Sequence, residues 1–179
     1  MRRLAAPMAP ALAWLGARWV ARQRARHRAD GGHLPAEARS TLARYFPAET
    51  LDAARLAVVP RIDPPRLLSM ARRLGLAAVD FERVLGITFG DTIVLAERVT
   101  QGALLPTLFH ELVHVEQARQ LGARAFVRRY VREWIEAGRY GAIPLERDAY
   151  ALQRRYEEAP GEPFDVAAEV ARRLYTGGP

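Results

Sequence analysis

The sequence predicts an α+β fold, in which a mostly helical domain carries a small antiparallel sheet. Helical patterns stand at both ends of the chain, and strand-like patterns lie between them. Half of the 179 residues are hydrophobic and 26% are charged, which is typical of a globular chain and not of a disordered one. A chain of this length can bury a sizeable core.

Charge divides the chain into a basic arm, residues 1–32, and a single domain, residues 33–179. All 27 basic residues are arginine, and seven of them lie in the first 28 residues, which contain no acid. The rest of the chain balances 20 basic against 20 acidic residues. Because nucleic-acid-binding domains carry a basic excess, we expect no nucleic-acid partner for the domain.

The apolar run within the arm is too short to span a membrane, which takes roughly 20 apolar residues. Pro7 and Pro10 interrupt it, and arginines stand where a signal peptide would have its cleavage region. One interpretation is a helix that packs on its own domain, followed by a solvated linker over residues 29–32. The other is peripheral contact with an anionic membrane surface. Localisation therefore stays open between the cytoplasm and a membrane surface.

The strand signals lie in the first half of the domain. After expected helices at residues 35–46 and from Pro47, residues 56–62 have the β-branched content of an edge strand. A helix is expected over residues 64–74. Next, the run ITFGDTIVL alternates apolar residues around Gly90-Asp91, which predicts a β-hairpin.

Helical patterns fill the second half of the domain. Gly122 separates the first two predicted helices, and Pro144 suits the first position of the third. The expected ranges are 104–120, 123–139, 144–157 and 164–175.

Residues 105–117, LPTLFHELVHVEQ, carry a pattern with a chemical mechanism. His110 and His114 are four residues apart, so both imidazoles project from one helix face and can reach one metal ion. Glu111 is rotated by about 100° from His110, which leaves it beside the metal, where it can take a proton from a metal-bound water. The neighbouring residues are apolar, so the helix is expected to be buried, and buried polar groups need partners. The alternative is a pair of core histidines that bind backbone carbonyls.

A third protein ligand must come from elsewhere in the chain, and cysteine is absent. Glu116 faces away from the histidine pair, which leaves the downstream acids Glu133, Glu136, Glu146 and Asp148 among the candidates. Glu146 is preferred because it follows Pro144 in the first turn of a helix, whereas Asp148 points the other way. The alternative for Glu146 is a carboxylate favoured there by the helix dipole.

The HELVH motif with a glutamate on a later helix resembles the gluzincin branch of the zincin metallopeptidases. The hairpin just upstream fits too, since zincins place strands before the active-site helix and pair the edge strand with extended substrate. Residues 55–155 are similar to small bacterial zincin-peptidase domains that remain largely uncharacterised. This resemblance implies Zn²⁺ bound by His110, His114 and Glu146, Glu111 as general base, and a peptide or protein substrate.

One position departs from the gluzincin pattern, which often has an aspartate four residues after the ligand glutamate. Here that residue is Tyr150. Tyr150 shares a helix face with Glu146 and can orient a ligand, stabilise an oxyanion as a catalytic residue, or belong to the core. Arg139 and Tyr140 are further oxyanion candidates, with a solvated loop favoured for both.

The leading hypothesis is a zinc-dependent metallopeptidase that hydrolyses peptide (amide) bonds through a water activated by Glu111. The alternative is a non-catalytic zincin-fold interaction module with a structural or vestigial metal site. Two histidines and a carboxylate also accept manganese, cobalt or iron, so the choice of zinc depends on the resemblance. The short chain leaves little room for a deep specificity pocket, which suggests selection of substrate by the arm or by a partner.

Overall fold

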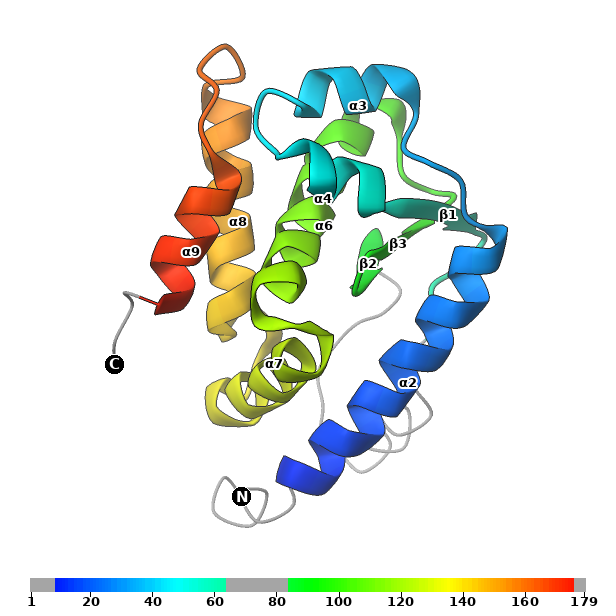
Figure 1. Ribbon diagram of the computed structural model, residues 1–179, viewed down its shortest axis with the longest axis vertical. Coiled ribbons are helices and arrows are strands. Elements are labelled where there is room, and N and C mark those ends of the chain that lie inside the picture. Colours follow the sequence, from blue (N-terminus) through cyan, green and yellow to red (C-terminus); the bar gives the residue numbers. More distant parts are fainter. Residues whose placement is uncertain (1–8, 64–83, 176–179) are drawn as a thin grey trace.

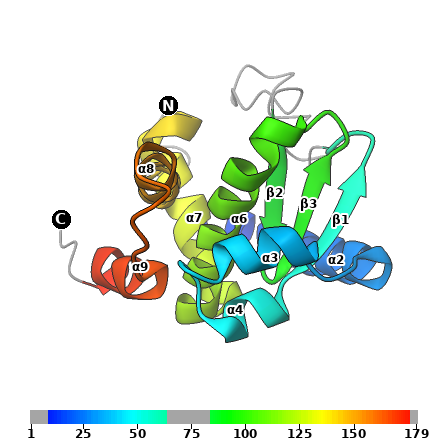
Figure 2. The ribbon, with the colours of Figure 1, turned by 90° about the horizontal axis from the view of Figure 1, so that it is seen from above.

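The computed structural model describes residues 9–63 and 84–175 and has the predicted class, a mostly helical α+β fold with a small sheet (Figure 1). The helix expected over residues 64–74 lies outside the described residues. Figure 2 shows the three strands side by side with helix α6 (Gln101–Leu121) along one side of the sheet. Helix α2 (Ala9–Asp30) contacts all three strands from the other side, so the sheet lies between two helical layers.

The sheet contains the predicted hairpin and an additional parallel strand. Strands β2 (Gly86–Phe89) and β3 (Thr92–Ala96) pair antiparallel, and Gly90 takes the turn with a φ of 72°. Strand β1 (Arg55–Val59) lies at an edge, as expected, but runs parallel to β3 in the order β1-β3-β2. The sheet is therefore mixed and not purely antiparallel, because β1 joins β3 across the sequence and not its neighbour β2.

Strand β3 is buried over its whole length because both faces of the sheet are covered. Ile93 and Leu95 face the core beneath α6, while Val94 and Ala96 pack with Trp19 and other residues on the α2 side. This alternation places Ile87 and Phe89 of β2 with the α2 layer.

Helix α2 continues to Asp30 as a single element, which corrects the expected linker over residues 29–32. Gly32 forms an antiparallel bridge with Leu56, with N–O distances of 3.0 and 2.8 Å in the two directions. The chain that follows α2 is thus held against β1 by backbone hydrogen bonds. Among the described residues, no helix combines the length and apolar composition needed to cross a membrane.

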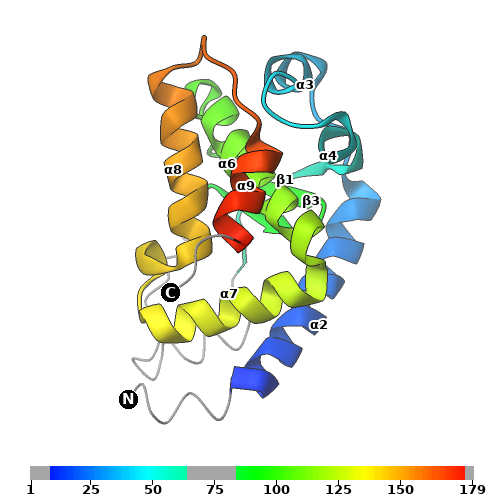
Figure 3. The same cartoon turned by 60° about the vertical axis from the view of Figure 1, so that its left-hand side comes forward.

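Helix α6 is the central helix of the fold, and its residues from Leu108 to Ala118 are all buried, as the apolar pattern predicts. Helices α7 (Ala123–Ala137), α8 (Pro144–Glu158) and α9 (Val166–Tyr175) pack against it, and Figure 3 shows α8 alongside α6 and α7 crossing below them. An aromatic cluster of Tyr45, Phe109, Tyr156 and Phe164 connects α6 to α8 and to the turn over residues 43–46. The remaining elements of the described residues are α3 (Ala36–Leu42), α4 (Ala48–Ala53) and the 3₁₀ turn η2 (Tyr140–Ala142).

Candidate metal centre

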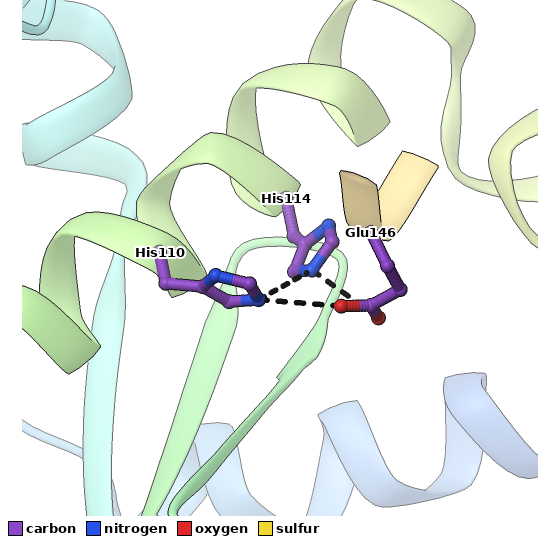
Figure 4. Close-up of side chains that lie close together, drawn as sticks. All are labelled: His110, His114 and Glu146. Carbon is purple, nitrogen blue, oxygen red and sulfur yellow. Dashed lines mark hydrogen bonds and ion pairs between the residues drawn. The ribbon is translucent and has the colours of Figure 1, made fainter. Parts of the chain in front are cut away.

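Two imidazoles from α6 and one carboxylate from α8 converge in the interior (Figure 4). The Nε2 atoms of His110 and His114 lie 3.2 Å apart. Glu146, in the first turn of α8 after Pro144, places Oε2 3.3 Å from Nε2 of His110 and Oε1 3.5 Å from Nε2 of His114. The three predicted ligands thus form a compact triangle, and all three are buried.

The size of this triangle fits a tetrahedral metal site. Donor atoms about 2.0–2.1 Å from a zinc ion lie about 3.4 Å from one another when their angles are tetrahedral. The two nitrogens lie 3.2 Å apart, and each lies 3.3 or 3.5 Å from a different oxygen of the Glu146 carboxylate, so all three separations are close to that value. In addition, Oε2 of Glu146 is buried without a hydrogen-bond partner among the described residues. Buried carboxylate oxygens need a partner, and a cation within the triangle provides one.

Two glutamines fix which nitrogen of each imidazole faces the triangle. Nδ1 of His114 lies 2.8 Å from Oε1 of Gln117, and Nδ1 of His110 lies 3.0 Å from Oε1 of Gln153. The amide of Gln117 donates to the carbonyl oxygen of Leu145 at 3.1 Å, and that of Gln153 to Glu157, which settles the amide orientations. Each glutamine oxygen therefore accepts a hydrogen bond from Nδ1–H of its histidine. Both Nε2 lone pairs are left free for a metal.

Glu133 fixes the start of α8, where the third ligand stands. Its Oε2 accepts a hydrogen bond from the backbone N–H of Leu145 at 3.0 Å, and its Oε1 pairs with Arg129 at 2.7 Å. The sequence made Glu133 a candidate ligand. In the structure it binds the N-terminal end of α8 and lies outside the triangle. A carboxylate at a helix N-terminus satisfies an otherwise unpaired N–H and suits the helix dipole.

Glu146 and His114 of the triangle favour each other's charged forms. Burial alone would lower the pKa of His114, but the neighbouring Glu146 carboxylate outweighs it and raises the pKa to about 9. Burial likewise opposes the charge of Glu146, yet the two imidazoles hold the pKa of this carboxyl well below its usual range. In the absence of a metal, a proton on His114 thus fills the role of the cation.

Glu111 lies beside the triangle and contacts strand β2. Its Oε2 is 2.7 Å from the hydroxyl of Thr88, which also lies 3.0 Å from the backbone carbonyl oxygen of Glu111. Burial raises the pKa of Glu111, while the two histidines and Thr88 act against that rise. A raised pKa suits a group that takes up and releases a proton near neutral pH.

Gly86 allows β2 to approach the Glu111 side chain closely. A Cβ atom at position 86 would lie 2.8 Å from Oε1 and 2.9 Å from Cγ of Glu111. These distances are shorter than van der Waals contact, so any other residue at this position would displace the carboxylate.

Three tyrosines surround Glu146. Tyr130 donates a hydrogen bond to Oε1 of Glu146 at 2.6 Å, and burial together with the Glu146 charge raises the Tyr130 pKa well above its usual value. The ring of Tyr150 lies 4.4 Å from that of His110 and is 39% exposed. Tyr140 is half-buried and lines the cavity described below, so it does not lie in a solvated loop, whereas Arg139 is exposed.

Other acids of this region have partners elsewhere. Glu116 binds Thr50, Arg119 and Gln120 and faces away from the histidines, as the helical spacing predicts. Asp148 pairs with Arg173 at 3.1 Å.

A cavity of about 800 Å³ opens beside the triangle, which corrects the expectation of little room for a deep pocket. Glu111, His114, Tyr140 and Glu146 line it together with residues of α2, β2 and α7. Tyr150 is not among the lining residues, so its position favours contact with His110 over contact with a molecule in the cavity.

The residues that orient the triangle were not predicted from the sequence. Gln117 follows His114 by three residues, a spacing that places both on one helix face and could have indicated it. Thr88, Tyr130 and Gln153 come from other elements, and no local spacing links them to the motif.

Comparisons of the chain with protein-family models, with curated proteins and with solved structures found no match. The chemistry of this site is therefore argued from its geometry and its residue types.

Proposed function

We propose that the chain is a zinc-dependent metallopeptidase of the gluzincin type. His110, His114 and Glu146 would hold Zn²⁺, and Glu111 would act as the general base. The observation that carries this proposal is the buried group of two imidazole nitrogens and one carboxylate, whose separations are close to those around a tetrahedral ion, with a second buried carboxylate at its side. A closed structural metal site would not need the adjacent Glu111 carboxylate.

Zinc in this position would polarise a peptide carbonyl and lower the pKa of a bound water to about 7. Glu111 would take the proton of that water and return it to the leaving amine. Thr88 holds the Glu111 carboxylate in place by the 2.7 Å hydrogen bond. Tyr140 lines the same cavity, and burial followed by the Glu146 charge raises its pKa, so its phenol keeps its proton and could donate a hydrogen bond to an oxyanion.

A peptide is favoured as substrate by strand β2. All four residues of β2 line the cavity, and the order β1-β3-β2 leaves one edge of this strand without a strand partner among the described residues. Backbone N–H and C=O groups along a free edge can pair with an extended peptide.

Metal content tests the site directly. Protein purified without added metal is analysed for zinc as wild type, His114→Ala and Glu111→Gln. The matched controls are His33→Ala and Glu136→Gln, which change the same residue types at exposed positions. We expect near-stoichiometric zinc in the wild type, in both controls and in Glu111→Gln, and none in His114→Ala.

Cleavage of a peptide library then tests the activity. Wild type and both controls should cut, and Glu111→Gln should lose roughly 10²–10⁴-fold in rate, the usual contribution of a general base. Zinc without cleavage would support a non-catalytic interaction module instead. A wild type that binds no zinc would refute the zinc peptidase and would also exclude a structural zinc site.

A further inference from the structure

The cavity beside the metal triangle has apolar walls mainly from three elements, while α6, η2 and α8 contribute the side chains of the candidate site. Helix α2 forms one of these walls, with Leu15, Trp19 and Val20 among the lining residues, and β2 and α7 form the others. The arm that the sequence separates by charge is thus a structural part of the cavity.

Several contacts hold α2 in this position. Arg24 makes two hydrogen bonds to the carboxylate of Asp91, at 2.7 and 2.6 Å, and Arg28 lies 2.9 Å from the same group. At the other end of the helix, Gly16 packs closely against α7, since a Cβ there would lie 3.4 Å from Val127. Between them, Trp19 packs edge-on against Phe89 of β2 with ring centroids 5.1 Å apart.

Among the described residues, the lining is apolar except at the end that holds the candidate site. Its polar side chains are those of the candidate site and of two exposed arginines on α2, whose aliphatic stems can cover apolar surface. The remaining lining side chains are aliphatic or aromatic, and they include all three tryptophans of the chain, Trp14, Trp19 and Trp134.

The volume of the cavity indicates a ligand with more than one apolar group. A cavity of roughly 150 Å³ is enough to hold a benzene ring. The cavity here, at about 800 Å³, can therefore take several large side chains.

We propose that α2 is one wall of the substrate-binding cleft and that the substrate is a peptide segment with consecutive large apolar side chains next to the cleaved bond. This inference rests on the proposed peptidase function. A fatty acyl chain would also suit the apolar lining, but it would leave the free edge of β2 without hydrogen-bond partners, whereas a peptide satisfies it.

The tryptophans provide a binding signal that does not depend on catalysis. Glu111→Gln protein, as purified, is titrated with two pools of capped peptides of equal length, and tryptophan fluorescence is recorded. One pool carries Leu, Phe or Val at its central positions, and the other carries Ser, Asn or Gln. N-lauroylglycinamide is the acyl probe.

Leu15→Glu, added to the Glu111→Gln background, tests the α2 wall. Leu15 is 45% exposed and lines the cavity, so the change should leave the fold intact. Ala21→Glu is the matched control, because it adds the same charge at an exposed position of α2 outside the lining. We expect the apolar pool to bind at least about tenfold more tightly than the polar pool, and Leu15→Glu but not Ala21→Glu to remove about tenfold.

Equal binding of the two pools, or no binding of either, would overturn the proposal. So would tighter binding of the acyl probe than of the apolar pool, or equal effects of the two α2 variants. Cleavage by the wild type is measured separately on the same pools. Saturable binding of the apolar pool without cleavage would refute the peptidase and support the apolar peptide site. Cleavage of the polar pool alone would support the peptidase and refute the apolar peptide site.

Discussion

Thr88 contacts Glu111 in a way that suits both protonation states of the carboxyl. Its single hydroxyl hydrogen can point to the carboxylate, 2.7 Å away, or to the backbone carbonyl oxygen of Glu111, 3.0 Å away. When Glu111 is ionised, Thr88 donates to it. When Glu111 carries a proton, the carboxyl donates to Thr88 and the hydroxyl donates to the carbonyl, so no buried group loses its partner.

Thr88→Val should therefore impair proton transfer without removing the metal. The hydrogen bond to the ionised form lowers the pKa of Glu111, so its loss raises that pKa, and the acidic limb of kcat/KM moves to higher pH. We expect kcat to fall by about tenfold at pH 7, the usual effect of losing a hydrogen-bond partner that orients a group at a metal site. Thr100→Val, at an exposed position, is the control. An unchanged pH profile would show that Thr88 has no influence on the base.

Gly86→Ala should separate metal binding from catalysis. The added Cβ must push the Glu111 carboxylate aside, while the triangle is not touched. We expect zinc content to stay at the wild-type level and kcat to fall by about 10²-fold, the effect of misplacing a catalytic group by roughly 1 Å. Gly102→Ala, where an added Cβ meets nothing within 4 Å, is the matched control. Full activity of Gly86→Ala would mean that Glu111 is not the base.

Proton release on metal binding follows from the pKa of His114. With a pKa of about 9, this imidazole is protonated at pH 7 in metal-free protein, and a metal ligand must be neutral. Zinc uptake at pH 7 should release about one proton, and the release should vanish above that pKa. Calorimetry in buffers of different ionisation enthalpy measures this number. No release at pH 7 would contradict the pairing of His114 with Glu146.

At the scale of single residues, the helical spacing of His110, His114 and Glu111 was enough to predict three side chains of the candidate site. Glu146 needed the additional inference that Pro144 starts a helix, and the structure brings it to the pair. The orienting residues Gln153 and Tyr130 could not be predicted, because their contacts depend on how α7 and α8 pack against α6.

At the scale of elements, α2 is held to the hairpin by one carboxylate that serves two arginines. Desolvation opposes the charge of Asp91, but the hydrogen bond and charge of Arg24, with Arg28, hold its pKa below the ordinary value of 3.8. A depressed pKa means that the ion pairs stabilise the fold fully above that ordinary value, and that the gain is lost as pH falls through the folded-state pKa.

Asp91→Asn should accordingly destabilise the protein at pH 7 and have little effect at pH 2. Because Arg24 is 42% exposed, the loss at pH 7 should be modest, at most about 1 kcal/mol. Urea unfolding at the two pH values measures this loss of stability. The control is Asp63→Asn, which removes the exposed ion pair of Asp63 with Arg61. A loss of equal size at both pH values would rule out the ion pairs as its cause.

The hairpin and α6 were predictable as elements because their signals are local: alternation around Gly90-Asp91, and a nearly continuous apolar surface. The mixed sheet was not, since the pairing of β1 with β3 joins segments far apart in sequence. The same holds for the bridge between Gly32 and Leu56, which replaces the expected linker.

At the scale of the whole molecule, a metal ion in the buried triangle should stabilise the folded state. An ion that binds only the folded state stabilises it, and zinc at 100 times its dissociation constant should raise Tm by roughly 5–10 °C. Thermal unfolding with and without zinc measures the shift, and His114→Ala should show none. If His114→Ala responds like the wild type, the stabilising ion binds elsewhere.

The fold class was predictable because the composition and the order of helical and strand-like segments are global properties of the chain. The cavity was not, because its walls come from α2, β2 and α7, which meet only in the folded protein.

The close approach of Gly86 to Glu111 also has a consequence for recognising relatives of this chain. A glycine 25 residues before the motif glutamate is required wherever β2 lies this close to the base. Homologues that keep the glutamate should keep this glycine, and those in which a larger residue stands there should have lost the glutamate as well. Under the proposed function, the pair would be a two-position signature that separates catalytic relatives from inactive ones.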